Sequence, residues 1–323
     1  MEGQRSSNPR VSLGMPVYNG ERFLRETMDS LLAQTYKDFE LVISDNGSTD
    51  ETERMCREYA SRDHRIRYYR ENLNRGAGWN YNRVVELARG EYFKWAAHDD
   101  LCAPAYLERC VEVLDRTPAV VLCYPDDIDI DENGNKIDRK RLSHIPSSQR
   151  ANSPDPAQRL RQLVRLDYDC EQVFGLIRLN VLRRTALILN YTDSDRTLLG
   201  ELGLYGQFFE IPEPLFYHRH HGGSSGRANP ISGGWHLRAG WFDPRLKGRV
   251  LFPQWRQVWE YVKAIFRSPL NLPVKLRCLF WLGVGYRNRL GALAAEFVAG
   301  LRNFFAGAGR PKNGATRAAE AHG

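Results

Sequence analysis

The chain has 323 residues, 42% of them hydrophobic and 26% charged, which is typical of a globular protein and excludes a disordered chain. Its six cysteines form no Cys-x-x-Cys pair, and their spacing fits neither a zinc site nor a disulfide framework, which suits a reducing compartment. The formal net charge of +7 is uneven, because residues 245–323 hold 14 Lys or Arg against 3 Asp or Glu.

The first 124 residues alternate between strand-like and helix-like segments after a short polar stretch, residues 1–10, that shows no secretory signal. Apolar runs predict strands at residues 11–17, 39–43, 66–69, 91–95 and 120–124. Helical spacing predicts helices at residues 23–34, from a cap at Thr49 or Asp50 to residue 60, and at 76–88 and 105–116. This alternation predicts βαβ units, and therefore an α/β fold with a mainly parallel sheet and helices on both faces.

Two adjacent carboxylates, Asp99 and Asp100, follow the predicted fourth strand among apolar neighbours. Burying them is costly unless a positive group joins them, and a hard divalent cation carrying a diphosphate is one such partner. The alternative is a solvated helix N-terminus with Pro104 inside the next helix. Because ligands bind at the carboxyl ends of strands in such sheets, we expect Pro16, Asp45 and these two aspartates to lie on one edge.

Residues 128–137 predict a hairpin around Asn133-Gly134. They also match the first half of a calcium loop, but Lys140 stands where a bidentate Glu is needed, which excludes that interpretation. Residues 139–158 are polar and rich in Pro and Ser, as in a loop. Further along, the pattern predicts helices at 160–166, 180–189 and 195–205 and strands at 208–211 and 215–218.

The pattern changes from Trp255 onward. Apolar residues recur at helical spacing in two stripes: Trp255, Val258, Trp259, Val262, Ile265 and Phe266, then Leu290, Leu293, Phe297, Leu301 and Phe304. The apolar run at residues 279–286 is far too short to span a bilayer. Two interpretations stay open: basic amphipathic helices in an anionic membrane interface, or a helical cap on the preceding domain.

Five segments occur in a fixed order: residues 11–20, 34–43, 44–50, Asn74-Arg75-Gly76 and His98-Asp99-Asp100. In this order they resemble the family 2 glycosyltransferases, with a GT-A, Rossmann-like nucleotide-sugar fold, over about residues 9–226. The expected organisation is a flexible N-terminus at 1–10, a GT-A domain at 11–226, a helical, basic amphipathic extension at 227–305 and a disordered tail at 306–323.

The resemblance implies roles for residues near the donor nucleotide. Pro16 and Tyr18 would line the base pocket, and the Asp45 carboxylate would accept hydrogen bonds from the base. Asn74 would place a loop near the nucleotide, and Arg75 could face phosphate. From the residues themselves, Asp45 could also belong to a plain turn before a helix cap, and the loop that follows could be an ordinary one.

The resemblance also places His98-Asp99-Asp100 at the family's metal-binding Asp-x-Asp motif, with His98 replacing the first acid. Asp100 would bind Mn²⁺ or Mg²⁺, and Asp99 would face the ribose or the waters of the metal. Arg219 could pair with phosphate, and His221 could complete the metal site. For the last two, a solvated strand end is the alternative interpretation.

A transfer to a hydroxyl needs a base. The resemblance places this base before a helix in the second half of the domain, where Asp195 is the preferred residue and Asp193 is a rival. The alternative for either residue is that it only caps the N-terminus of the helix. One base and in-line attack would invert the anomeric configuration.

The resemblance therefore implies an inverting, metal-dependent hexosyltransferase-type enzyme. Its donor would be a UDP-, dTDP- or GDP-linked sugar, and its acceptor a hydroxyl of a glycan or lipid-linked molecule in cell-surface glycan or glycolipid synthesis. The expected location is cytoplasmic, with peripheral contact to the inner face of the cytoplasmic membrane. A non-catalytic, membrane-associated nucleotide-binding protein of the same fold is the alternative. The first strand lacks the G-x-G-x-x-G of dinucleotide-binding enzymes, and no nucleic-acid-binding module is present.

Overall fold

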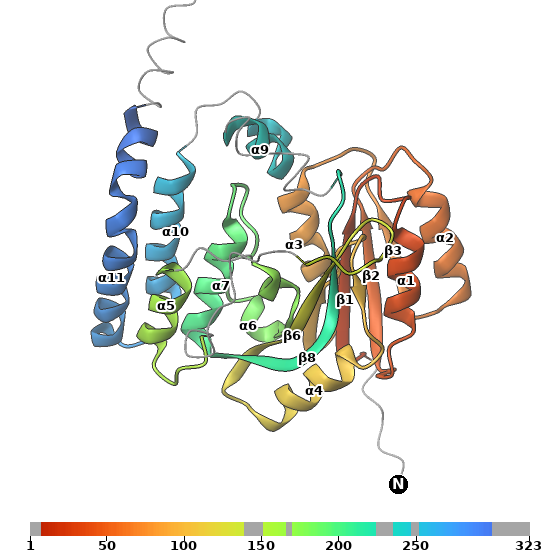
Figure 1. Ribbon diagram of the computed structural model, residues 1–323, viewed down its shortest axis with the longest axis horizontal. Helices are drawn as coiled ribbons and strands as arrows, with labels where there is room; N and C mark the ends of the chain where they lie inside the picture. Colours follow the sequence, from red (N-terminus) through yellow and green to blue (C-terminus); the bar gives the residue numbers. More distant parts are fainter. Residues whose placement is uncertain (1–7, 139–150, 166–169, 224–234, 247–251, 299–323) are drawn as a thin grey trace, which may run out of the picture.

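A computed structural model describes residues 8–138, 151–165, 170–223, 235–246 and 252–298 (Figure 1). Within these ranges one sheet has the strand order β3-β2-β1-β4-β7-β6-β8-β5. The strands are β1 (Val11–Val17), β2 (Phe39–Asp45), β3 (Ile66–Arg70), β4 (Tyr92–Trp95), β5 (Leu101–Cys102), β6 (Val120–Ile130), β7 (Leu176–Arg178) and β8 (Gln207–Arg219). Parallel pairing joins β1 to β2 and β4, β2 to β3, and β6 to β8, whereas β7 and β5 pair antiparallel with their neighbours.

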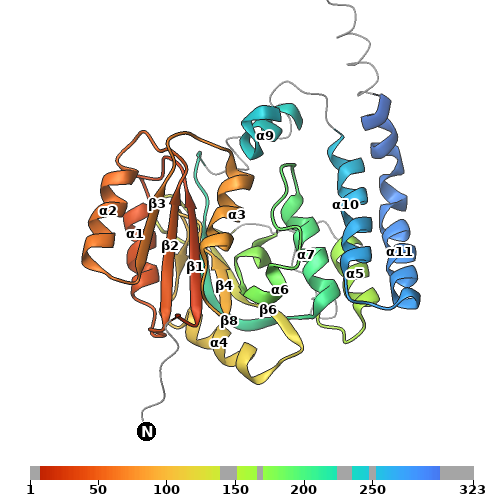
Figure 2. The same ribbon diagram turned by 180° about the vertical axis from the view of Figure 1, so that it is seen from behind.

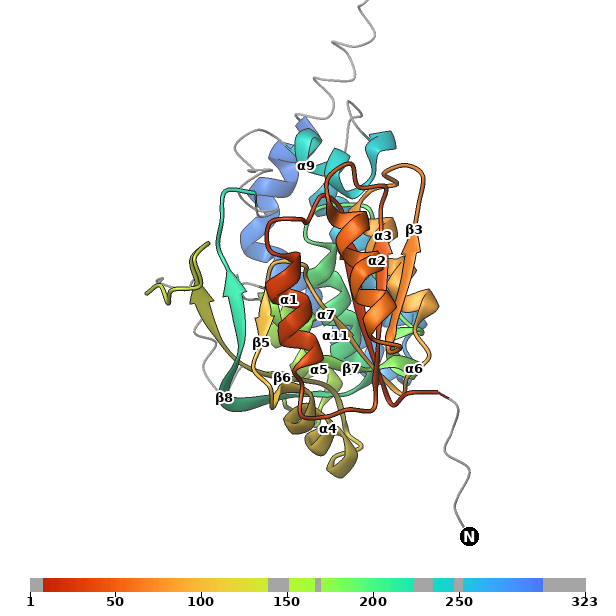
Figure 3. The ribbon, with the colours of Figure 1, turned by 90° about the vertical axis from the view of Figure 1, so that its right-hand side faces the viewer.

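Helices cover both faces of this sheet (Figures 2 and 3). They are α1 (Leu24–Leu32), α2 (Thr52–Arg62), α3 (Ala77–Leu87), α4 (Tyr106–Arg116), α5 (Pro156–Arg165), α6 (Leu179–Leu182), α7 (Ser194–Tyr205), α9 (Trp235–Phe242), α10 (Pro253–Arg267) and α11 (Leu272–Tyr286). Successive residues of a strand point to opposite faces. Accordingly, Leu41 and Ile43 of β2 pack in the cluster formed with α1, α2 and α4, whereas Val42 packs with α3, α6 and α7. The expected mixed, mainly parallel α/β fold is confirmed.

Several predicted elements have different bounds in the structure. The strands expected at 120–124, 208–211 and 215–218 belong to two long strands, β6 and β8, while β5 and β7 are too short to leave an alternating pattern. The hairpin turn at Asn133-Gly134 is present, with Gly134 at φ 83° and a bridge between Ile130 and Lys136.

The predicted helix at 180–189 is wrong beyond Leu182. Leu187 adopts a left-handed backbone, at φ 58°, and the backbone N–H and C=O of Ile188 are bonded to the side chain of Asn82. Such side-chain contacts compete with helical hydrogen bonds. The helix expected at 160 begins earlier, at Pro156, where the Asp155 carboxylate accepts from the Ala157 N–H. The expected tail at 306–323 lies outside the described residues.

The C-terminal helices pack onto the sheet domain. A third apolar cluster joins α10 and α11 to α5 and α7, and it contains Tyr261, Cys278 and Tyr286. Residues 290–298 continue the rod of α11 as a further helical segment. Among the described residues, none of the helices has the length and apolar character needed to cross a membrane. The cap interpretation of this region is therefore confirmed for the packed faces of these helices.

A buried ion pair fastens α10 to α7. The carboxylate of Glu201, 1% exposed, accepts from Arg267 and from the Ala186 N–H. Burial raises the pKa of Glu201, although both of these contacts oppose the rise. Removing the arginine would leave a buried carboxylate without its cation.

We expect Arg267→Gln to lower the free energy of unfolding by about 3 kcal/mol at neutral pH. The folded-state pKa of Glu201 is already above its unfolded value and would rise further in the variant. The loss of unfolding free energy is therefore largest at high pH, where Glu201 is ionised. It shrinks as the pH falls and the carboxyl of Glu201 takes up a proton. Denaturant unfolding across pH measures this. Arg277→Gln is the matched control, because its partner Asp155 is solvent-accessible and the pair is worth under about 1 kcal/mol.

Candidate functional site

The turns after β1 and β2 are bonded to each other at the carboxyl edge of the sheet. Val17 is in register with Asp45, and the Asn46 N–H donates to the Val17 carbonyl at 2.9 Å. Asn19, at φ 50°, donates its N–H to the Ser48 hydroxyl, and its side chain accepts from the Thr49 N–H. The structure thus brings the β1 and β2 ends together as predicted.

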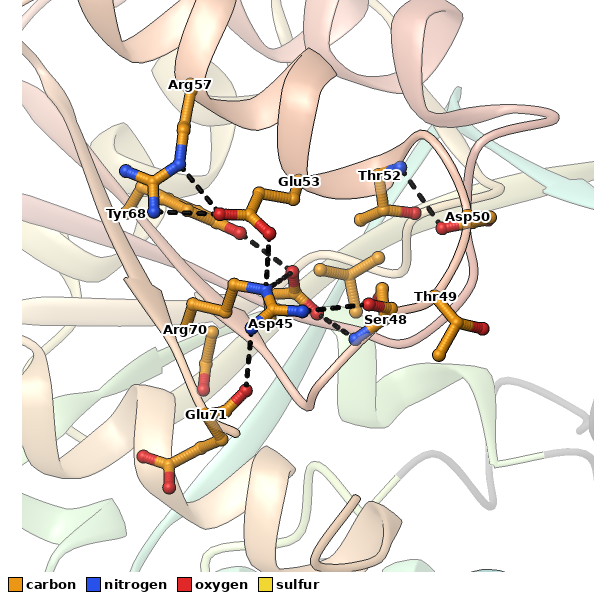
Figure 4. A network of polar contacts seen from close by, with 12 residues as sticks. Asp45, Ser48, Thr49, Asp50, Thr52, Glu53, Arg57, Tyr68, Arg70 and Glu71 are labelled. Atoms are coloured by element: carbon orange, nitrogen blue, oxygen red, sulfur yellow. Dashed lines mark hydrogen bonds and ion pairs between the residues drawn. The ribbon is translucent and has the colours of Figure 1, made fainter. Parts of the chain in front are cut away.

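Asp45 ends β2 and is fully buried in a polar network (Figure 4). Its Oδ1 accepts from the Ser48 N–H at 2.8 Å, and its Oδ2 accepts from the Tyr68 hydroxyl at 2.7 Å. Arg70 lies 3.6 Å from Oδ2 and is held by Glu53 at 2.8 Å. Burial, followed by the hydrogen bond to Asp45, raises the pKa of Tyr68, so the tyrosine stays a donor to the carboxylate.

The loop before α3 is held by Asn46. Its side chain donates to the Asn74 side chain at 3.0 Å and to the Gly76 carbonyl, and it accepts from the Arg75 N–H at 3.0 Å. Gly76 has φ 92°, and a Cβ there would lie 2.4 Å from the Phe242 carbonyl oxygen of α9. The predicted pair Asn74 and Arg75 therefore lies directly beside the β2 end, with α9 packed over the loop.

The β1 turn contributes two predicted base-pocket residues. Pro16 is buried within β1, one residue before the strand ends, and Tyr18 follows the strand with 42% of its surface exposed. Gly20, in the same turn, faces His98, because a Cβ on Gly20 would lie 2.7 Å from the imidazole. The base-pocket candidates and the His98-Asp99-Asp100 segment thus share this edge.

Asp99 and Asp100 meet the end of β8 at this edge. Asp100 Oδ1 accepts from the Arg219 backbone N–H at 2.8 Å, and His218 Nδ1 lies 3.2 Å from the same oxygen, outside hydrogen-bond geometry. Burial opposes the charge of His218, but Asp100 raises its pKa to about 10, so the contact is an ion pair. Within the described ranges, no hydrogen bond reaches Asp100 Oδ2.

His221 and Asp99 form a second contact between these segments. His221 Nδ1 accepts from the Gly223 N–H at 3.2 Å, so Nε2 donates to Asp99 Oδ2, at 2.9 Å. Burial opposes ionisation of Asp99, but the His98 charge and the His221 hydrogen bond lower its pKa to about 2. Both nitrogens of His221 are therefore engaged within the protein.

Arg219 is buried, and its guanidinium is bonded inside the protein. It donates to the Asp99 carbonyl at 2.9 Å, to the Glu132 carbonyl and to Glu26 at 2.6 Å, and it stacks over Phe23. These contacts hold the turn that carries Asp99 and Asp100. The phosphate role expected from the sequence stays a prediction.

Asp193 and Asp195 lie at the start of α7. Asp193 adopts a left-handed backbone at φ 65°, and Asp195 accepts from the Arg196 N–H. Burial, followed by the charges of Asp99, Asp100 and Asp195, raises the pKa of Tyr81 of α3.

Tyr68, Tyr81 and His218 were not predicted as site residues. His218 lies one residue before the end of β8, so strand position was the signal that could have identified it, whereas Tyr68 is the middle residue of β3 and carries no such signal. Across the part of the chain that the structure describes, no group of three or more His, Cys, Asp or Glu side chains forms a complete metal cage.

Comparison with protein families matches residues 12–184, more than half of the chain, to the sequence model described as Glycosyl transferase family 2. An uncharacterized glycosyltransferase of Rickettsia typhi is 39% identical over 123 residues, 37% of this chain and 37% of that protein. A second, from Methanocaldococcus jannaschii, is 34% identical over 129 residues, 39% of this chain and 44% of that protein. The chain therefore matches less than half of the length of these relatives.

Two solved structures share the fold. S. aureus TarS in complex with UDP-GlcNAc aligns with a TM-score of 0.58 at 15% identity, over 86% of this chain and 72% of that one. The mannosyltransferase PcManGT of Pyrobaculum calidifontis, in complex with GDP-Man and Mn²⁺, aligns with a TM-score of 0.52 at 17% identity, over 93% and 88%. The GT-A architecture expected from the sequence is thereby confirmed.

Proposed function

The chain belongs to glycosyltransferase family 2, and on that premise we propose that it transfers a hexosyl group from a nucleoside-diphosphate sugar to an acceptor hydroxyl. One observation carries the proposal: the Asp45 network, the Asn74–Gly76 loop and the Asp99–Asp100 turn follow β2, β3 and β4 at one edge of the sheet. Structural neighbours hold UDP-GlcNAc and GDP-Man, which supports a donor of this class. UDP-, dTDP- and GDP-linked sugars are the candidates.

We assign the base pocket to Pro16, Tyr18 and Asp45. A carboxylate oxygen has two acceptor positions, so Asp45 can keep Ser48 and Tyr68 and still accept from a base N–H. Asn74 and Arg75 would border the nucleotide, and the Arg75 guanidinium, 48% exposed and 3.7 Å from Glu71, would donate to a phosphate with its exposed N–H groups. The Asp99 carboxylate would accept from the ribose.

The residues present fit a divalent cation. Mg²⁺ and Mn²⁺ favour oxygen ligands, and Mg²⁺ in particular is bound by one or two carboxylates together with substrate phosphates, not by a complete protein cage. Asp100 supplies such a carboxylate, because it is buried and its Oδ2 accepts no hydrogen bond from the described residues. His221 is close by, since its Nε2 donates to the neighbouring Asp99. A bound Mn²⁺ or Mg²⁺ would offset the negative charge that develops on the leaving diphosphate.

We assign the base to Asp195. It would take the proton of the acceptor hydroxyl as that oxygen attacks the anomeric carbon, and attack opposite to the leaving diphosphate inverts the configuration. Its place in the first turn of α7, where the resemblance to the family expects the base, supports this role. Asp193 is the rival. We propose a glycan or lipid-linked acceptor, in cell-surface glycan or glycolipid synthesis.

A donor panel tests the function. We expect one of the UDP-, dTDP- or GDP-linked sugars to raise the melting temperature in the presence of Mn²⁺, since a ligand that binds only the folded state stabilises it. Transfer is then measured as nucleoside diphosphate release with glycan and lipid-linked acceptors. If no nucleotide sugar shifts the melting temperature, the proposed function is wrong.

Asp45→Asn should weaken donor binding at least about tenfold, because the amide loses the charge and presents an N–H where an acceptor is needed. The change should also lower the free energy of unfolding by about 1–3 kcal/mol, since the amide has one acceptor oxygen for two donors, the Ser48 N–H and the Tyr68 hydroxyl. Calorimetry with the free nucleoside diphosphate measures the affinity. Tyr68→Phe is the control: it keeps the carboxylate and should change affinity only a few-fold. Wild-type affinity in a folded Asp45→Asn variant contradicts the assignment.

A further inference from the structure

Helix α10 buries Gln257 and Glu260 and leaves three of its aromatic side chains, Trp255, Trp259 and Phe266, exposed. Arg267 pairs with the buried Glu201, Arg256 donates to Asn190 at 2.6 Å, and Gln257 donates to the Asp193 carbonyl. On the outward side, Trp259 is 60% exposed and Phe266 is 55% exposed. A surface helix ordinarily exposes polar side chains and buries its large aromatic ones.

The same outward surface continues along the neighbouring helices. The Trp255 indole donates to the Leu293 carbonyl at 3.0 Å, and Lys275 donates to the Phe266 carbonyl at 2.9 Å, so the exposed residues of α10 adjoin α11 and residues 290–298 at both ends. Figures 1 and 2 show α10 and α11 side by side at the outer edge of the molecule. We define the aromatic face as the exposed residues Trp255, Trp259, Phe266, Leu272, Leu276, Phe280, Leu290, Phe297 and Val298.

A cationic pocket adjoins the aromatic face. It has a volume of about 360 Å³, lies between α5 and the end of α11, and is lined by Arg161, Arg287, Arg289, Asn288 and Trp281, among others. The Arg161 guanidinium lies 4.1 Å from the Trp281 ring centroid, and this ring contacts Phe280 of the aromatic face at 5.1 Å.

Two cations of this pocket have no carboxylate partner among the described residues. Neither Arg161 nor Arg287 forms an ion pair there, and the Arg161 guanidinium donates only a long hydrogen bond, 3.4 Å, to Gln158 Oε1. Guanidinium groups bind phosphate oxygens in pairs of parallel hydrogen bonds. The pocket therefore has the chemistry of a phosphate site, placed beside exposed tryptophan and phenylalanine side chains.

We propose that the aromatic face and the cationic pocket together dock on an anionic phospholipid membrane, with a lipid phosphate in the pocket and the aromatic side chains in the interface. Trp and Phe next to Arg match the polar-apolar boundary of a bilayer. Residues 245–323 contain 14 basic and 3 acidic residues, and this excess of positive charge favours an anionic surface. A second copy of this chain is disfavoured as the partner, because the cations of the two copies would repel each other. Free phosphate would leave the aromatic face uncovered.

Vesicle co-sedimentation of the full chain tests the proposal. We expect binding to phosphatidylcholine vesicles that contain phosphatidylglycerol, weaker binding to phosphatidylcholine alone, and loss of binding at high salt. The double variant Trp259→Ser/Phe280→Ser should lower the partition coefficient at least about tenfold, since both side chains would leave the interface. Arg161→Gln and Arg287→Gln should each lower it about fivefold for the anionic vesicles.

Phe209→Ser is the matched control, because Phe209 is a similarly exposed aromatic residue on β8 and should leave binding unchanged. Thermal unfolding checks that every variant folds. The proposal is overturned if wild type ignores anionic vesicles, or if the double variant binds as wild type does. It is also overturned if gel filtration shows a dimer that Trp259→Ser dissociates while vesicles are not bound. Stabilisation by inorganic phosphate through Arg287 without vesicle binding would assign the pocket to a soluble anion instead.

Discussion

Asp100→Asn should lower the rate of sugar transfer about 10³-fold, the scale seen when a group that stabilises transition-state charge is removed. The asparagine keeps the size of the side chain and can still accept from the Arg219 N–H, so the turn should hold. It removes the negative charge at Oδ2, the oxygen we assign to the cation. Turnover is measured as nucleoside diphosphate release across a series of Mn²⁺ concentrations, and the Mn²⁺ needed for half-maximal rate should rise as well.

Asp99→Asn separates the two neighbouring aspartates. Because Asp99 is assigned to the ribose and is held by His221, its amide variant should raise the KM for the donor more than it lowers kcat. Melting temperatures within a few degrees of wild type establish that both variants fold. Undiminished turnover and an unchanged Mn²⁺ requirement in Asp100→Asn would show that Asp100 does not bind the cation.

The sheet edge that carries these aspartates could be predicted from the sequence because strand order along the chain and the parallel βαβ rule place strand ends together. Asp45 and the Asp99–Asp100 turn needed only their positions after apolar runs. Tyr68 could not be identified in this way, because its partner is chosen by sheet register: β3 pairs with β2 so that Ile43 is opposite Tyr68, and the hydroxyl reaches back to Asp45.

The orientation of α10 was likewise beyond the sequence pattern. The stripe from Trp255 to Phe266 predicts one apolar face, for a membrane interface or for packing on the domain, and Ile265 of that stripe packs on the domain. The helix nevertheless turns its tryptophans outward, because Glu201, Asn190 and the carbonyl of Asp193 on the sheet domain offer polar partners to Arg267, Arg256 and Gln257. Polar contacts between segments far apart in the sequence set the orientation of α10. The spacing of apolar residues within one helix contains no information about such contacts.

Asp195→Asn should lower kcat about 10²–10⁴-fold, the contribution typical of a general base. The change removes the proton acceptor and keeps the side-chain oxygen that accepts from the Arg196 N–H, so the start of α7 should persist. Donor affinity, measured by calorimetry, should stay near that of wild type, because the base faces the acceptor and not the nucleotide. A parallel fall in donor affinity would indicate a structural role instead.

Asp193→Asn is the matched comparison two residues away. Asparagine adopts the left-handed backbone of this position readily, at φ 65°, so the variant isolates the loss of the carboxylate from any strain at the start of α7. The backbone carbonyl of Asp193 accepts a hydrogen bond from the Gln257 side chain, and the substitution keeps this contact. We expect Asp193→Asn to retain most of the activity. If instead Asp193→Asn is inactive and Asp195→Asn turns over normally, the base is Asp193.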